Sequence, residues 1–413
     1  MMQQAQNTLH AAFRIVLTGG TLILLTGTHS ASAQVPDAQS GIASPSRVEE
    51  QIKAPELRRS VSPAVDVREL AIEGAPAGAE KITFVLNDLH IEGATVYTPE
   101  QLSRLYADRI GQTISLADLY GIAAQMTRAY RNDGYVLTQV VVPPQTIEGG
   151  TARLRVVEGY IDHVNVRLEQ GAHPETEQAM NLIRSYAARI TTGGALNVRD
   201  LERYMLLIND LPGVTVRGVL SPSKTQTGAA DLDILVQRDP FDALVGIDNY
   251  GTRFLGPVQM TGAASFNSML GNNERITGQA VIAPDPGNGI ELGYLALGYA
   301  QPLLPNGLKL ELTGNYTATN PGFTLDEFDV RGYSRFLSAS LSYPFIRSRA
   351  TSLYTNVTFD FRNVTTSNNI EDTRKDRIRA LRMGARLEHL DTIFGAGLNV
   401  FDVEIAQGLD LLG

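Results

Sequence analysis

Histidines and carboxylates are the side chains of this sequence best suited to chemistry, and neither type forms the pattern of a catalytic or metal site. No two histidines have the spacing of metal ligands; they are His10, His29, His90, His163, His173 and His389. Asp231 and Asp233 alternate along an expected strand, where they would solvate its outer face. The sequence has no G-x-S-x-G turn, phosphate-binding loop or glycine-rich dinucleotide turn. We therefore expect no enzyme activity, no cofactor, no nucleotide and no bound metal.

Composition narrows the class of protein further. A net charge of −9 gives no reason to expect nucleic acid as a partner, because that calls for a basic face. Only 19% of the 413 residues are charged, and cysteine is absent, which excludes disulfides and thiolate ligands. This length allows two or three domains.

The elements that could position any site are clearest between residues 79 and 159. An extended segment from Ile82 to Ile91 precedes two helices, whose starts carry the capping pairs Thr98/Gln101 and Ser115/Asp118. Helical spacing predicts a buried stripe of Leu119, Ile122, Ala123, Met126, Ala129 and Tyr130. Strands Tyr135–Val142 and Thr151–Glu158 follow, so the predicted order is β-α-α-β-β.

The same plan returns between residues 160 and 240. A strand at Tyr160–Arg167 precedes helices at Glu175–Ile190 and after Asn197, and strands Val214–Leu220 and Asp231–Gln237 close the unit. A repeat of this size indicates tandem modules, the alternative being a single domain of alternating elements.

From residue 241 to residue 413 the helical period disappears. Strand-length segments alternate apolar and polar residues, for example Leu353, Val357, Phe359 and Phe361 against Asn356, Thr358, Asp360 and Arg362. Alternation in segments of about ten residues is typical of a membrane β-barrel, with the polar face toward the lumen and the apolar face toward lipid. A soluble β-sandwich also alternates, but the long strands and the preceding units favour the barrel. About nine strands fit before Leu411.

Segments of the first unit also resemble a known protein family. Four segments in order resemble the first POTRA domain of two-partner secretion transporters of the haemolysin secretion/activation (ShlB/FhaC/HecB) type. They are Val85–Ala94, Arg131–Leu137, Val141–Gly150 and Arg153–Gly159. The resemblance implies two periplasmic POTRA domains followed by a sixteen-stranded outer-membrane barrel in a Gram-negative bacterium. We therefore expect the chain, which also lacks a terminal aromatic residue, to hold only the N-terminal part of the barrel.

The resemblance further implies that the middle strand of the first POTRA lies at the margin of its sheet. From Tyr135 this strand has no charged residue, and proline follows only at Pro143. Edge strands normally carry charged residues or proline, which prevent pairing with another polypeptide. An extended exported partner protein could add there as a further strand. We therefore predict a partner-binding segment of Val136, Leu137, Thr138, Gln139, Val140, Val141 and Val142. The alternative is that the second POTRA covers this edge.

Residues 1–33 read as a secretory signal, with an apolar run at Ile15–Thr28 and small residues at Ala31–Ala33. Residues 34–78 read as a linker in which Arg47–Ile52 could form a short helix. The resemblance implies that such a helix can plug the barrel, and the sequence leaves this open.

The sequence predicts secretion of a partner protein through the barrel, with the outer-membrane lipid as the barrel's surroundings. An assembly insertase would carry more POTRA domains, a passive porin would lack them, and a barrel-embedded enzyme would need a nucleophile with a base. Val330–Tyr333 matches a lumen-loop motif of the wider superfamily, but it lies too early in the chain. We interpret Arg331 as part of an ordinary strand.

Overall fold

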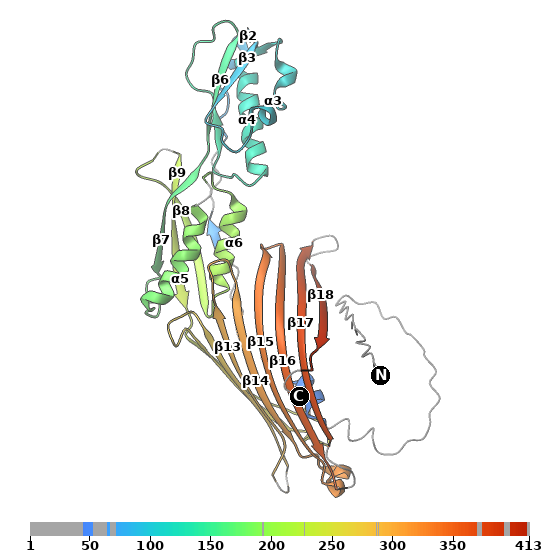
Figure 1. Cartoon of the computed structure of the whole chain (residues 1–413). Helices are drawn as coiled ribbons and strands as arrows, with labels where there is room; N and C mark the ends of the chain where they lie inside the picture. The colour runs from blue at the N-terminus through green and yellow to red at the C-terminus, as the bar shows by residue number, and fades with distance from the viewer. Residues whose placement is uncertain are drawn as a thin grey trace, which may run out of the picture.

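The computed structural model of the chain describes residues 44–52, 64–66, 72–191, 194–226, 228–285, 287, 289–369, 374–391 and 397–410. Two small α/β units and one large β-sheet lie end to end in the order of the chain (Figure 1). The expected signal sequence and the first residues of the expected linker lie outside the described residues. No described helix has the length and apolar character needed to cross a membrane.

The first unit places a three-stranded sheet against a long helix. Its elements are β2 (Thr83–Val85), β3 (Asp88–Glu92), α3 (Pro99–Ser103), β4 (Thr113–Ser115), α4 (Leu116–Asn132), β5 (Gln139–Val141) and β6 (Thr151–Val157). The sheet order is β3-β6-β5, with β3 parallel and β5 antiparallel to β6, while β2 pairs with β4. This confirms the β-α-α-β-β plan, with β2 and β4 as an added short pair.

Both predicted capping boxes are present. Thr98 and Gln101 begin α3, and Ser115 and Asp118 begin α4, each with reciprocal side-chain and backbone hydrogen bonds. The predicted apolar stripe of α4 is confirmed except at Ala129, which is only partly buried. Its other members are buried in one core with Leu86, Val140 and Leu154. Local sequence therefore determines both the start and the orientation of α4.

Two predicted strand lengths and one helix length are wrong. The segment Ile82–Ile91 divides into β2 and β3, because β2 pairs with β4 whereas β3 pairs with β6. Glycine commonly ends a helix, so Gly111 is the expected end of the first helix, but α3 already ends at Ser103. The strand expected at Tyr135–Val142 is reduced to β5, because residues 135–138 turn and the Thr138 N–H donates to Tyr135 O at 3.0 Å.

The second unit repeats the topology of the first. It comprises β7 (Tyr160–Leu168), α5 (Glu177–Ala187), α6 (Val198–Asn209), β8 (Val214–Pro222) and β9 (Ala229–Arg238). Strand β9 pairs parallel with β7 and antiparallel with β8, as β6 does with β3 and β5. Asn197 caps α6 as predicted, and the helix expected at Glu175–Ile190 is α5 with a short 3-10 turn after it. The internal repeat is thus confirmed at the level of strand pairing.

The remaining strands form one antiparallel sheet in chain order. They are β10 (Phe241–Asp248), β11 (Gln259–Asn267), β12 (Arg275–Asp285), β13 (Gly289–Pro302), β14 (Lys309–Thr319), β15 (Arg331–Arg347), β16 (Thr351–Ser367), β17 (Arg374–Asp391) and β18 (Gly397–Gly408). Each strand pairs with the next, so β10 and β18 are the two margins of this sheet in the described part of the chain. The nine strands match the number predicted.

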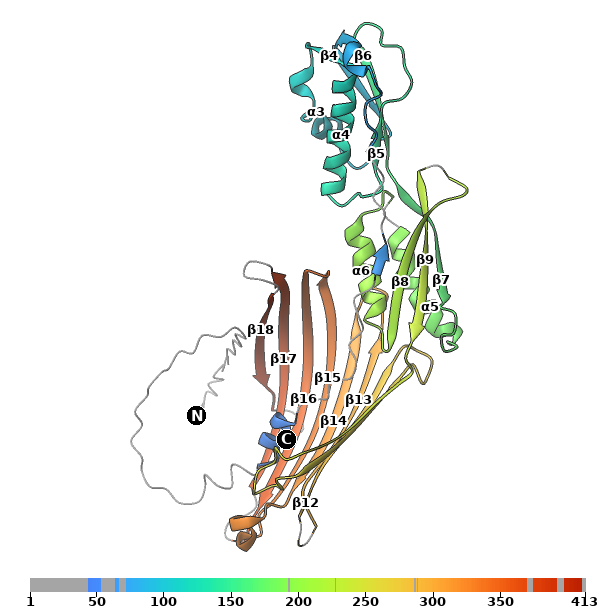
Figure 2. The ribbon, with the colours of Figure 1, turned by 180° about the vertical axis from the view of Figure 1, so that it is seen from behind.

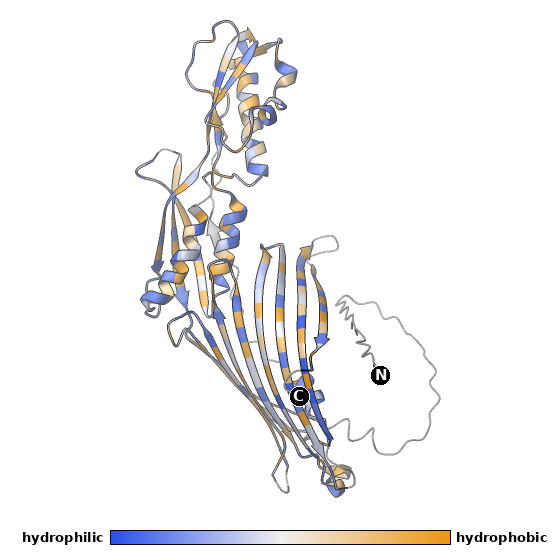
Figure 3. Cartoon of the chain, in the orientation of Figure 1, coloured by the Kyte–Doolittle hydropathy of each residue, from blue (hydrophilic) through white to orange (hydrophobic). Residues whose placement is uncertain are grey.

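One face of this sheet is apolar and solvent-exposed. Strand pairing places Leu310, Leu341, Val357, Met383 and Ile405 opposite one another in a row across five neighbouring strands. The last four of these side chains are exposed in the isolated chain. Apolar and polar residues alternate along each strand (Figure 3). An exposed apolar row of this length is the property expected of a surface in contact with lipid.

Candidate partner-binding site

The structure divides the predicted partner-binding segment between a strand and a turn. Gln139, Val140 and Val141 form β5, which lies at a margin of the sheet because its described pairing is with β6 on one side only. Thr138 and Val140 are buried, while Val136, Leu137, Gln139, Val141 and Val142 are partly buried. Only the three β5 residues therefore present a strand edge.

The middle residue of that edge already has a hydrogen-bond partner. The Val140 N–H donates to Thr127 Oγ1 of α4 at 3.0 Å, and the Thr127 hydroxyl in turn donates to Ala123 O at 2.9 Å. A strand added beside β5 would have to replace the first of these bonds. Sequence reasoning missed Thr127 because its neighbours in the helix predicted only core packing.

The second unit contacts the turn before β5. Leu137 packs against the core of the second unit. The Val198 N–H donates to Gly134 O at 2.8 Å, and Asn197 Nδ2 donates to Asp133 O at 3.2 Å. A Cβ atom at Gly159 would lie 2.5 Å from Leu137 Cβ, so this position requires glycine for the close approach. These contacts place the junction between the units at residues 133–137.

Glu158, beside that glycine, accepts several hydrogen bonds within the first unit. It accepts hydrogen bonds from the Thr95 N–H at 2.8 Å, the Val96 N–H at 2.9 Å, the Tyr130 hydroxyl at 2.9 Å and the Thr95 hydroxyl. Burial acts to raise the pKa of Glu158, but these donors outweigh it and lower the pKa below its ordinary value. The carboxylate is therefore ionised at neutral pH and joins α4 to the end of β6.

The edge strand of the second unit has a partner from the same chain. The short strand β1 (Ala64–Asp66), within the expected linker, pairs parallel with β8 and extends the sheet to the order β1-β8-β9-β7. Figure 2 shows β1 as a small blue arrow beside β8. Polypeptide addition to a POTRA-like sheet edge thus occurs within this molecule, at β8. No local pattern in residues 64–66 predicts this pairing.

Side-chain bonds fasten the second unit to the large sheet. Arg347, at the end of β15, binds both oxygens of Asp210 at 2.7 Å, and Arg203 on α6 donates to Pro344 O at 2.9 Å and Phe345 O at 3.1 Å. Tyr186 on α5 donates to Leu304 O at 3.0 Å, and burial raises the pKa of this tyrosine to about 12. The unit is therefore held at one fixed end of the sheet.

The helix α2 (Pro45–Gln51) lies against the polar face of the large sheet. Val48 packs in a cluster with Leu255, Val281, Leu292, Leu325 and Val330. Glu49 forms an ion pair with Arg362 of β16 at 3.1 Å and accepts a hydrogen bond from Thr317 of β14 at 2.6 Å. A Cβ atom at Gly332 would lie 2.5 Å from Pro45 Cγ, so glycine admits the helix there. The predicted short helix is present, on the face expected to line a lumen.

Arg331 is the first residue of β15 and forms an ion pair with Asp329 at 3.0 Å. Its side chain is exposed. This agrees with the interpretation of Val330–Tyr333 as the start of an ordinary strand.

Comparison with known families identifies both halves of the molecule. Residues 84–159 match the ShlB-type POTRA domain, and residues 228–413 match the haemolysin secretion/activation protein ShlB/FhaC/HecB. The first match covers the unit that holds β5, and the second begins at β9 and covers the large sheet.

Curated relatives are named as transporters. The heme/hemopexin transporter protein HuxB of Haemophilus influenzae strain 86-028NP is 25% identical over 287 residues, which are 69% of this chain and 49% of that protein. The outer membrane transporter CdiB of Escherichia coli is 27% identical over 195 residues, 47% of this chain and 32% of that protein. The chain thus spans about half the length of HuxB.

Solved structures share the fold. CdiB from Escherichia coli superposes with a TM-score of 0.66 at 20% identity, covering 93% of this chain and 69% of that one. CdiB from Acinetobacter baumannii gives a TM-score of 0.55 at 14% identity, covering 88% of this chain and 68% of that one. The fold is accordingly a POTRA domain followed by the nine-stranded antiparallel sheet of a partial β-barrel. Residues 84–159 and 228–413 thus carry the ShlB-type POTRA domain and the haemolysin secretion/activation protein ShlB/FhaC/HecB domain, respectively.

Proposed function

We propose that this protein recognises an exported partner protein of the haemolysin or adhesin type in the periplasm and secretes it through its β-barrel. Residues 79–159 and 160–240 would be the two receiving POTRA domains, and residues 241–413 the N-terminal part of the barrel. The observation that carries the proposal is the β1–β8 pairing, because an extended polypeptide already lies along a POTRA edge. Main-chain hydrogen bonds of this kind bind extended polypeptides with little regard to their sequence.

The fixed attachment of the second domain supports transfer from the POTRA domains to the barrel. The ion pair Arg347–Asp210 and the bonds of Arg203 hold α6 against the periplasmic end of β15. A partner bound along β8 would therefore lie beside the barrel entrance. With no phosphate-binding motif in the sequence, folding of the partner outside the cell would drive its passage outward.

The proposal predicts that one exported protein depends on this gene. Deletion should remove a single large polypeptide from the culture medium and leave it in the periplasm, as measured by mass spectrometry of both fractions. Restoring the gene should restore secretion. An unchanged set of extracellular proteins would contradict the proposed function.

We retain Val136–Val142 as the proposed contact of the first POTRA with the partner, centred on β5. A photo-reactive amino acid at Val141 should crosslink to the partner in living cells. The matched control is the same amino acid at His90, an exposed residue of β3 at the opposite margin of the same sheet. Equal yields from the two positions, or crosslinks from His90 alone, would rule out β5 as the docking edge.

We further propose that β1 must leave β8 before a partner can bind there. Asp66 and Val219 are paired residues, so their Cα atoms lie about 4.8 Å apart, within reach of a disulfide. The chain has no native cysteine, so the double variant Asp66→Cys, Val219→Cys offers a single crosslink. We expect secretion to fall at least tenfold when this pair is oxidised and to recover on reduction, while each single variant secretes normally. Normal secretion by the oxidised pair would show that β1 need not move.

A further inference from the structure

Three side chains with metal-ligand atoms converge at one end of the second POTRA. The Asp162 carboxylate lies 3.2 Å from His163 Nδ1, and the Asp231 carboxylate lies 3.5 Å from the same nitrogen. One ligand atom from each of the three residues lies within 4.8 Å of the others. The sequence could not indicate this group, because Asp231 follows His163 by more than sixty residues. The prediction that Asp231 merely solvates the strand overlooked this neighbour, whereas Asp233 pairs with Arg167 at 3.2 Å.

A β-bulge explains how two consecutive residues reach one site. Successive side chains of a regular strand point to opposite faces. The β7–β9 register shifts between Ile161 and His163: Ile161 pairs with Ala230 and His163 with Asp231, which leaves Asp162 as the extra residue. Bulges re-aim side chains in this manner. Asp162 therefore joins His163 and Asp231 instead of pointing away from them.

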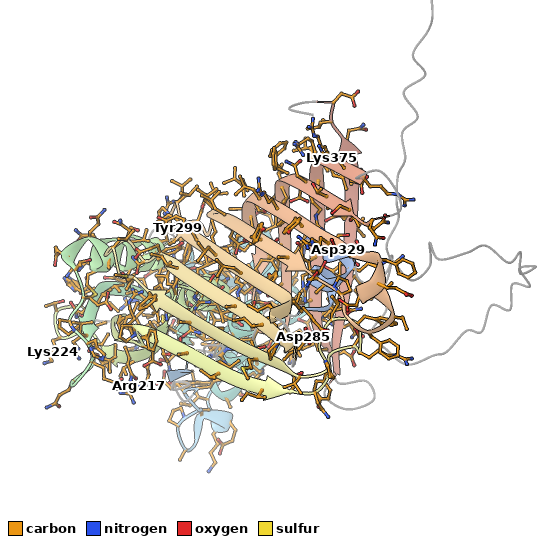
Figure 4. All side chains as sticks on the ribbon, turned by 90° about the horizontal axis from the view of Figure 1, so that it is seen from below. Arg217, Lys224, Asp285, Tyr299, Asp329 and Lys375 are labelled. Atoms are coloured by element: carbon orange, nitrogen blue, oxygen red, sulfur yellow. The ribbon has the colours of Figure 1, made fainter. Side chains whose placement is uncertain are left out.

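Neighbouring hydroxyl groups orient the Asp162 carboxylate, whereas one oxygen of the Asp231 carboxylate lacks a hydrogen-bond donor within the described residues. Asp162 Oδ2 accepts hydrogen bonds from Ser223 at 2.9 Å and Thr225 at 2.8 Å, in the loop between β8 and β9 that Lys224 marks in Figure 4. Those hydroxyls, Thr225 first, lower the pKa of Asp162 and keep it ionised. Asp231 Oδ1, in a side chain that is 25% exposed, is itself buried and accepts no hydrogen bond within the described residues, with His163 Nδ1 as its neighbour at 3.5 Å. A buried carboxylate oxygen without a donor is costly unless a cation lies near it.

We propose that Asp162, His163 and Asp231 form a binding site for a divalent cation, with Zn²⁺ as the ion that fits them. Tetrahedral Zn²⁺ with bonds of about 2.0–2.1 Å separates its ligand atoms by roughly 3.4 Å, close to both measured distances from His163 Nδ1. One imidazole and two carboxylates are ligands that Zn²⁺ accepts, with water completing the sphere. Ser223 and Thr225 would act as positioning residues that hold the Asp162 carboxylate.

Such an ion would join β7, β9 and the loop after β8 at the end of the domain nearest the first POTRA. Tyr160, which begins β7, follows Gly159 of the junction directly. The inference concerns the stiffness of this junction and stands on contacts separate from those of the proposed function.

The test is calorimetric titration of the metal-stripped, detergent-purified full-length protein with ZnCl₂. We expect one saturable equivalent of Zn²⁺ and a raised melting temperature of the POTRA region, since an ion that binds the folded state stabilises it. His163→Gln and Asp231→Asn should each weaken binding at least tenfold, and Ser223→Ala about tenfold through lost orientation. The matched control His90→Gln, beside Glu92 alone at 3.8 Å, should bind as the unaltered protein does.

Circular dichroism of each variant without metal establishes that it is folded. Zinc binding that persists undiminished in both His163→Gln and Asp231→Asn would place the ion elsewhere and overturn the site. Absence of saturable Zn²⁺ binding would show that the three side chains interact only with one another.

Discussion

Replacing Glu49 with alanine is expected to release α2 from the polar face of the large sheet and, on the hypothesis that this helix plugs the barrel, to open a conducting path. The Glu49 side chain is only 4% exposed, and it binds both Arg362 and Thr317. Removing it leaves Arg362 facing the helix without its carboxylate partner. Loss of one member of a buried pair costs about 3–5 kcal/mol, and we expect about half of this beside a hydrated lumen. The equilibrium constant for docking of α2 should then fall roughly ten- to hundredfold.

The measurement is the open probability of the full-length protein in planar bilayers, supported by sensitivity of cells to large antibiotics. Glu50→Ala is the matched control, because Glu50 is the exposed neighbour of Glu49 on the same helix. Arg362→Ala should open the pore as Glu49→Ala does, since it removes the other half of the ion pair. Identical, low open probability in Glu49→Ala and Glu50→Ala would show that the apolar contacts of Val48 alone keep α2 in place.

Replacing Leu119 with alanine is expected to destabilise the first POTRA by about 2–5 kcal/mol. Leu119 is fully buried, at 0% exposure, in a core that joins α4 to Leu86 and Leu154. A cavity there removes contacts that a domain of this size cannot replace, because its total stability is of the order of 5 kcal/mol. The domain should therefore be partly unfolded, and secretion of the partner should fall with it.

Native-state hydrogen exchange of the α4 amides in the full-length protein measures this loss directly. Gln125→Ala, at an exposed position of the same helix, is the matched control and should change the local free energy of unfolding by less than about 0.5 kcal/mol. Unchanged exchange in Leu119→Ala would mean that this face of α4 contributes little to the core.

Local patterns in the sequence determined the elements and their buried faces. The capping boxes at Thr98 and Ser115 predicted the starts of α3 and α4, because a cap involves residues only three apart. Alternation predicted the strands of the barrel sheet and which face is apolar, because side chains of a strand alternate whatever its neighbours are. The order of family segments in residues 84–159 predicted the fold class, and the family match confirms it.

Contacts between distant segments were decided only by the tertiary structure. Thr127 accepts a hydrogen bond from the Val140 N–H, and β1 pairs with β8. Glu49 forms an ion pair with Arg362, and His163 lies beside Asp231. Periodicity predicts on which face of an element a residue lies. It does not predict which other segment packs there, because many pairings share the same local pattern. The bulge at Asp162 and the turn at residues 135–138 likewise depend on neighbouring elements. Both candidate sites of this protein therefore arise from pairings that no local pattern in its sequence encodes.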